Sequence, residues 1–82
     1  MWDNMEPATI ELRLYASLRK WHEAPSWSLE VGLPLRISDF VKEIGIPEAE
    51  VAIIFLNGKR AGLGCLLSNG DTLDLFPAIG GG

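Results

Sequence analysis

One segment with helical periodicity, flanked on both sides by strand patterns, constrains the fold of this chain more than any other feature. Its apolar residues recur at helical spacing and share one face: Ile37, Phe40, Val41 and Ile44. Ser38 is a good N-cap, and Asp39 lies in the first turn, where the helix dipole favours an anion. Gly45 and Pro47 then end a helix of about two turns. A single short amphipathic helix predicts a partner layer of β-sheet.

Two segments before the helix alternate apolar and polar residues, the period of half-buried strands. The first begins at Ala8, and its apolar positions are Ile10, Leu12 and Leu14. The second has Trp27, Leu29 and Val31 as its apolar positions, and Gly32 ends it. The polar stretch Ser17–Pro25 between them predicts a loop with a short helical turn. Together they predict a wide hairpin.

The most apolar run follows the helix. Val51–Leu56 is continuous and β-branched, which predicts a central strand buried on both faces. Asn57 and Gly58 stop it with a strong hairpin signal. Lys59 and Arg60 begin a short return strand.

The last strand pattern completes an α+β fold. Ser68–Asp71 predicts a tight turn, and Thr72–Phe76 predicts a strand that Pro77 closes. The element order is that of a β-grasp, a mixed sheet of about four or five strands with one main helix on one face. We expect three parts: a loose N-terminal leader over 1–7, a β-grasp domain over 8–77 and a flexible C-terminal tail over 78–82.

Composition excludes several classes of protein. Seven Lys/Arg against eleven Asp/Glu give a net charge of −4, whereas nucleic-acid binding needs a clustered basic face. One cysteine cannot form an internal disulfide. No stretch approaches the roughly 20 apolar residues of a membrane span, and the acidic start does not resemble a signal peptide. We therefore expect a soluble, cytoplasmic domain without nucleic-acid or membrane partners.

Few side chains are available for catalysis. His22 is the only histidine and lies in a polar loop, so we expect it to be solvated. Cys65 lies in an apolar stretch and is expected to be partly buried rather than nucleophilic. One histidine and one cysteine cannot form a structural zinc site. Asp71 and Asp74 fit a turn residue and a solvent-facing strand residue. We expect no metal site and no enzymatic activity of the chain alone.

The glycine-rich end is the unusual feature. Gly80, Gly81 and Gly82 lack Cβ atoms, so this backbone can enter a narrow channel and approach a partner's catalytic groups. Pro77 stiffens the base of the tail, and Ala78 to Gly82 can span about 16 Å. A thin terminus of this kind suits a partner that activates its carboxylate. The alternative is a frayed end or linker remnant without function.

Three segments resemble the MoaD/ThiS sulfur carriers, and together they cover most of Ile10–Gly82. Gly70–Gly82 resembles the family's ending: a Gly-Asp turn, an apolar strand, Phe-Pro and a terminal Gly-Gly. Leu12–Arg19 is similar to the aromatic-Ala-x-Leu-Arg segment of the MoaD branch. Leu56-Asn57-Gly58 resembles the family's Val-Asn-Gly turn. Ala78 departs from the pattern, which commonly has a second proline there, and Gly80 adds a third glycine.

The resemblance implies a ubiquitin-like β-grasp protein that carries sulfur. An adenylating enzyme that uses ATP would activate the Gly82 carboxylate, and a persulfide donor would convert it to a thiocarboxylate. Gly80 and Gly81 would allow the tail to thread, and the chain would bind no cofactor tightly. The sulfur would go to a molybdopterin precursor with the large subunit of molybdopterin synthase, the branch that the Leu-Arg segment favours. The other destination is a thiazole precursor of thiamine, with thiazole synthase.

Docking to these partners would use residues near the tail and the Asn-Gly turn. The candidates are Phe76, Pro77 and Ile79, with Leu63 and Leu66 in an apolar patch, and Lys59 and Arg60 for acidic groups. Two other classes remain open. One is a protein modifier joined to lysines through the terminal glycine, and the other is an interaction module with an inert tail. The sequence does not separate molybdenum from tungsten cofactor assembly.

Overall fold

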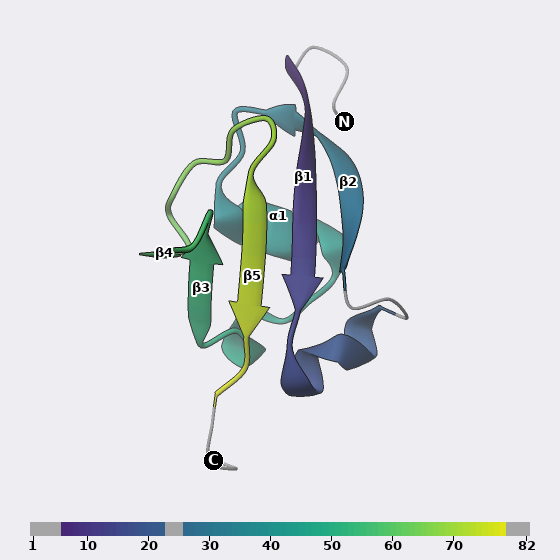
Figure 1. Ribbon diagram of the computed structural model, residues 1–82, viewed down its shortest axis with the longest axis vertical. Coiled ribbons are helices and arrows are strands. Elements are labelled where there is room, and N and C mark those ends of the chain that lie inside the picture. Colours follow the sequence, from purple (N-terminus) through teal and green to yellow (C-terminus); the bar gives the residue numbers. More distant parts are fainter. Residues whose placement is uncertain (1–5, 23–25, 79–82) are drawn as a thin grey trace.

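The structure, a computed structural model, describes residues 6–22 and 26–78. Figure 1 shows one sheet with the main helix lying across one of its faces. The elements in chain order are β1 (Glu6–Leu14), η1 (Ala16–Trp21), β2 (Ser26–Leu33), α1 (Ile37–Ile44), η2 (Glu48–Glu50), β3 (Ile53–Leu56), β4 (Lys59–Ala61) and β5 (Thr72–Phe76).

The strands form one five-stranded mixed sheet in the order β2-β1-β5-β3-β4. β1 and β5 are parallel neighbours, whereas the other three pairs are antiparallel. Among the described residues, α1 is the helix that covers a face of this sheet, and we call the opposite face the open face (Figure 1). This arrangement confirms the expected α+β, β-grasp fold.

β3 does not have the central place that its apolar sequence predicts. It begins at Ile53, lies second from one edge, and has Ile54 as its one buried residue. β5 occupies the centre instead. The apolar run is explained by two different faces: Ile54 packs under α1, whereas Phe55 lies on the open face among other aromatic side chains.

β1 begins at Glu6, earlier than the expected start at Ala8. Pro7 pairs with Gly32 of β2, although the sequence assigned it to the leader. Proline fits here because β5 pairs with β1 only from Glu11 onward, so the missing N–H breaks no ladder bond on that side. The rest of the expected leader and residues 79–82 lie outside the described residues.

The start of α1 differs from the prediction, and its end confirms it. Arg36, not Ser38, is the N-cap, and no side chain caps the helix. Instead, the N–H groups of Ile37 and Ser38 donate to backbone carbonyl groups of the segment that follows β4, at 2.9 and 2.8 Å. These bonds satisfy N–H groups of the first helical turn, to which a capping side chain would otherwise provide an acceptor. Gly45 ends the helix in the left-handed conformation, with φ 90°.

The core lies between α1 and the inner face of the sheet. Its fully buried side chains come from β1, β5, η1 and α1: Ile10, Leu12, Leu14, Leu18, Ile37, Phe40, Val41, Leu73 and Leu75. Asn57 and Gly58 form the expected hairpin turn, with φ 53° and 84°. Within residues 6–22 and 26–78, no helix has the length and apolar character needed to cross a membrane.

Candidate functional site

Three aromatic side chains meet on the open face where β5 ends. Phe76 stacks on Tyr15, with ring centroids 4.2 Å apart, and Phe55 meets Phe76 edge to face at 5.7 Å. They belong to the open face because their β5 neighbour Leu75 is buried beneath α1 and side chains alternate along a strand. Each such pair contributes about 0.5–1.5 kcal/mol beyond its burial. This aromatic cluster (Tyr15, Phe55 and Phe76) therefore holds the residue from which the chain leaves the sheet.

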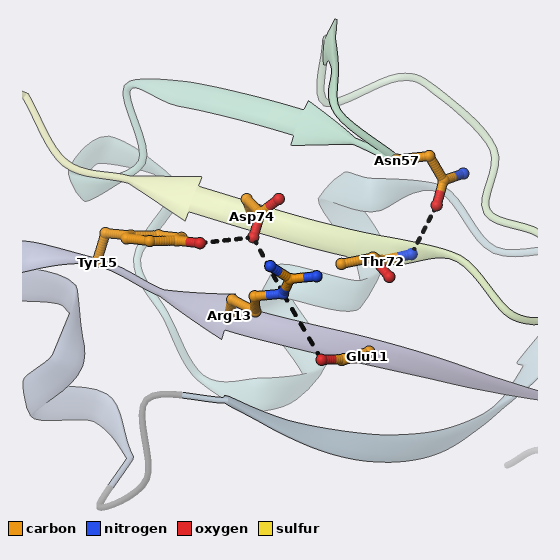
Figure 2. Close-up of polar contacts among 6 residues, drawn as sticks. All are labelled: Glu11, Arg13, Tyr15, Asn57, Thr72 and Asp74. Atoms are coloured by element: carbon orange, nitrogen blue, oxygen red, sulfur yellow. Dashed lines mark hydrogen bonds and ion pairs between the residues drawn. The ribbon is translucent and has the colours of Figure 1, made fainter.

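Asp74 joins the aromatic cluster to a charged group on β1. Its carboxylate accepts a hydrogen bond from the Tyr15 hydroxyl at 3.0 Å and lies 3.6 Å from Nε of Arg13 (Figure 2). The Asp74 side chain is only 14% exposed, against 44% for Arg13. The sequence predicted a solvent-facing aspartate. Asp74 does lie on the open face, but its side chain is largely covered because the parallel neighbour β1 brings two partners over it.

Arg13 is held between acidic groups along β1 and β5. Its Nε lies 3.6 Å from the Glu11 carboxylate as well as from Asp74 (Figure 2). The Tyr15 hydroxyl, followed by the charge of Asp74, raises the pKa of Arg13 above its ordinary value. The guanidinium therefore stays charged. Beside the aromatic cluster, the open face carries polar side chains that form ion pairs with one another.

A second polar group holds the opposite end of β5. The Asn57 side-chain amide donates to the Asp71 carboxylate at 2.8 Å, and its carbonyl oxygen accepts from the Thr72 N–H at 2.9 Å (Figure 2 shows the latter). Asp71 also accepts from the Ser68 N–H at 2.7 Å and is 9% exposed. The sequence treated Asp71 as an ordinary turn residue. The structure shows that it joins two turns and fixes the start of β5.

The predicted docking residues fall into separate places. Phe76 and Pro77 are half-buried at the end of β5. Arg60 pairs in register with Phe55, so it shares the open face, and Lys59 is exposed beside it on β4. Leu63 instead packs against the core beneath the sheet. The structure therefore brings Arg60, but not Leu63, to the face that carries Phe76.

Three predictions concern single residues away from this face. Cys65 is exposed, although the sequence predicted partial burial. Leu66 is 56% exposed, as a surface patch residue would be. His22 stacks on Trp27 with ring centroids 3.5 Å apart, so the expected solvated loop histidine is half-buried against an aromatic ring. Among the described residues, no three His, Cys, Asp or Glu side chains gather as metal ligands.

The tail residues that carry the expected chemistry are Ile79, Gly80, Gly81 and Gly82, and all four lie outside the described residues. The structure therefore positions the base of the tail through Pro77 and Ala78. Sequence reasoning found this base but missed the residues that hold it: Arg13, Tyr15, Phe55 and Asp74. Their alternation along strands was a usable signal. Their grouping required the β1–β5 and β3–β5 registers, which the sequence does not state.

Solved structures share this architecture. A putative molybdopterin converting factor, subunit 1, from Pyrococcus furiosus is 19% identical, with a TM-score of 0.71 over 88% of this chain and 99% of that one. Small archaeal modifier protein 1 of H. volcanii is 22% identical, with a TM-score of 0.73 over 88% and 99%. The complex of subunits 1 and 2 of molybdopterin-converting factor from Helicobacter pylori 26695 contains a chain 19% identical, with a TM-score of 0.55 over 90% and 99%.

At these identities the likeness shows the fold alone, a β-grasp. A family model gives the narrower assignment, because the Mut7-C ubiquitin model matches residues 7–80. The chain belongs to the Mut7-C ubiquitin family. The expected likeness to ubiquitin-like β-grasp proteins is thus confirmed at the level of family and fold. No curated protein is similar enough in sequence to count as a match.

Proposed function

We propose that this protein is a sulfur carrier that presents the Gly82 carboxylate to partner enzymes and contributes no catalytic residues of its own. One observation carries the proposal: the aromatic cluster fixes Phe76 at the end of a central strand, and the chain leaves the sheet there toward Gly-Gly-Gly. A fixed base followed by a tail with three consecutive glycines brings a carboxylate within reach of a narrow channel in a docked partner.

Loading takes place in three steps on a partner. In the first, a Gly82 carboxylate oxygen attacks the α-phosphorus of ATP, and pyrophosphate leaves. In the second, the terminal sulfur of a persulfide attacks the acyl carbon and AMP leaves, which gives an acyl disulfide. In the third, a thiol attacks the donor's own sulfur in that disulfide, so that a disulfide between thiol and donor forms and the thiocarboxylate is released. Because this activation consumes ATP, the proposal places the protein in the cytoplasm.

The acceptor that we favour is a molybdopterin precursor. Support comes from the two solved relatives whose names describe subunit 1 of molybdopterin converting factor. In the complex from Helicobacter pylori 26695, that subunit is bound to subunit 2, so this chain is proposed to act with a comparable large subunit. A thiazole precursor of thiamine is the alternative acceptor in the same chemical class.

A second function is favoured by a different relative. The H. volcanii protein is called a modifier and matches this fold as well as the converting-factor subunit does, with TM-scores of 0.73 and 0.71. As a modifier, the same activated carboxylate would form an isopeptide bond with a lysine. Activation by ATP is common to both functions, and the acceptor separates them.

The experiment follows the mass of the intact chain. The protein is first purified from its own cells, and its mass is expected to match a chain that ends at Gly82. It is then incubated with candidate adenylating enzymes, ATP and a persulfide donor. Exchange of oxygen for sulfur raises the mass by about 16 Da. Conjugates of higher mass that resist reductants would instead favour the modifier, and no change with any activating enzyme would contradict both functions.

Two glycine variants give a matched control. Gly81→Leu places a bulky side chain in the threading segment and is expected to abolish loading without lowering the melting temperature. Gly62→Ala alters a glycine where an added Cβ meets nothing within 4 Å, and it should load like the parent. Full loading of Gly81→Leu would show that threading of a bare backbone is not required.

A further inference from the structure

Among the described strands, none pairs with the outer edge of β2, so one long edge of the sheet is open. β2 is an eight-residue strand at the end of the strand order, and β1 is its one partner among the described residues (Figure 1). The opposite edge, β4, has three residues and carries Lys59 and Arg60, features that discourage further pairing. β2 has no lysine, arginine or proline. It is the edge with the least protection against another strand.

Hydrogen bonds of β1 show which way its backbone groups point. The N–H groups of Glu11 and Tyr15 donate to the carbonyl groups of Asp71 and Leu75, on the β5 side, at 2.9 and 3.2 Å. Backbone groups alternate in direction along a strand. The even-numbered residues of β1 therefore direct their N–H and C=O groups toward β2.

The register between β1 and β2 then fixes the direction along β2. Leu12 pairs with Trp27 and Ile10 with Leu29, so the odd-numbered residues of β2 use their backbone groups inside the sheet. The even-numbered residues of β2 therefore direct their N–H and C=O groups toward the free edge. Three of these are exposed: Ser26, Ser28 and Glu30.

We propose that β2 pairs with β2 of a second copy, antiparallel, with Ser28 opposite Ser28. This register sets Ser26 opposite Glu30 on both sides, so that the edge-directed groups of two strands form about six backbone hydrogen bonds. On the face toward α1, Trp27 meets Leu29 of the second copy. Both side chains are half-buried in the single chain, and pairing would bury them further.

Charge and burial select this register over its neighbours. A register centred on Glu30 places two carboxylates opposite each other, which is destabilising. A register centred on Leu29 requires Val31 and Gly32 to meet the second copy, and both are buried. With Ser28 at the centre, no like charges face each other and every paired residue is accessible. The edge therefore complements a second copy of itself.

Disulfide trapping tests the register in the Cys65→Ser background, which removes the native exposed thiol. Residues directly opposite across such a pair have Cα atoms about 5.5 Å apart, within disulfide range. Ser28→Cys should form a covalent dimer under mild oxidation. Ser26→Cys and Glu30→Cys should each remain monomeric alone and should crosslink when mixed. Crosslinking of Glu30→Cys with itself, or none by Ser28→Cys, would overturn the proposed register.

Sedimentation of the unmodified chain between about 0.01 and 1 mM tests pairing itself, over the weak affinities expected of a small interface. A concentration-dependent dimer is expected, and a monomer throughout would overturn the proposal. Ser28→Pro removes an edge-directed N–H that no described strand of the monomer uses, and Ser28→Lys places two like charges opposite each other. Each should weaken the dimer at least about tenfold with an unchanged melting temperature. Dimerisation of both variants at parental strength would also refute the pairing.

Discussion

The two faces of β5 place different kinds of residue only one position apart. Leu73 and Leu75 are fully buried beneath α1, whereas Asp74 and Phe76 on the open face are half-buried among polar and aromatic partners. The inner face contributes stability by excluding water. The open face holds its residues by specific contacts and leaves them accessible at the base of the tail. One strand therefore couples a core to a docking surface.

The inner face should show the largest effect on stability. Leu75→Ala removes a side chain with no exposed area, and we expect the free energy of unfolding to fall by about 2–5 kcal/mol because a cavity is left. Leu66→Ala is the matched control, since Leu66 is 56% exposed, and it should change stability by less than about 0.5 kcal/mol. Denaturant unfolding measures both. Equal effects would contradict the assignment of the inner face.

The polar group at the start of β5 should rank second. Asp71→Ala leaves the Ser68 N–H and the Asn57 amide without their acceptor, which we expect to cost about 1–3 kcal/mol. Asp71→Asn retains one carbonyl acceptor and should cost less. Amide hydrogen exchange of Thr72 and its neighbours should rise more in the alanine variant. An alanine variant as stable as the parent would show that the two turns are held by the backbone alone.

How far the sequence predicts this molecule differs between the two faces. Alternation of apolar and polar residues predicted β5 and its buried leucines, and Asn57-Gly58 predicted the hairpin between β3 and β4. The same pattern overstated β3, because an apolar run does not say which of its faces is covered. On the open face, the sequence did not predict which side chains lie together. Arg13 and Asp74 lie far apart in sequence and meet only through the parallel β1–β5 register.

The aromatic cluster should show a smaller effect on stability than either change above, but a larger one on loading. Phe76→Ala removes both ring contacts of a half-buried side chain, and we expect a loss of about 1–2 kcal/mol. Under the proposed function, Phe76→Ala should slow thiocarboxylate formation more than Phe76→Leu does, because leucine retains apolar volume at this position. The measurement is the rate of the mass increase at a temperature where both variants are folded. Equal loading rates for the two variants would show that the aromatic cluster does not contribute to docking of the partner.

The smallest effect should come from a single hydroxyl. Tyr15→Phe retains the ring that stacks on Phe76 and removes the donor to Asp74, so we expect a loss of about 0.5–1.5 kcal/mol. The control is a double-mutant cycle with Asp74→Asn, because removing either partner should make the second substitution cost less. Additive effects would mean that the hydroxyl and the carboxylate do not stabilise each other. In that case stacking alone, without the polar contacts of Asp74, would fix the end of β5.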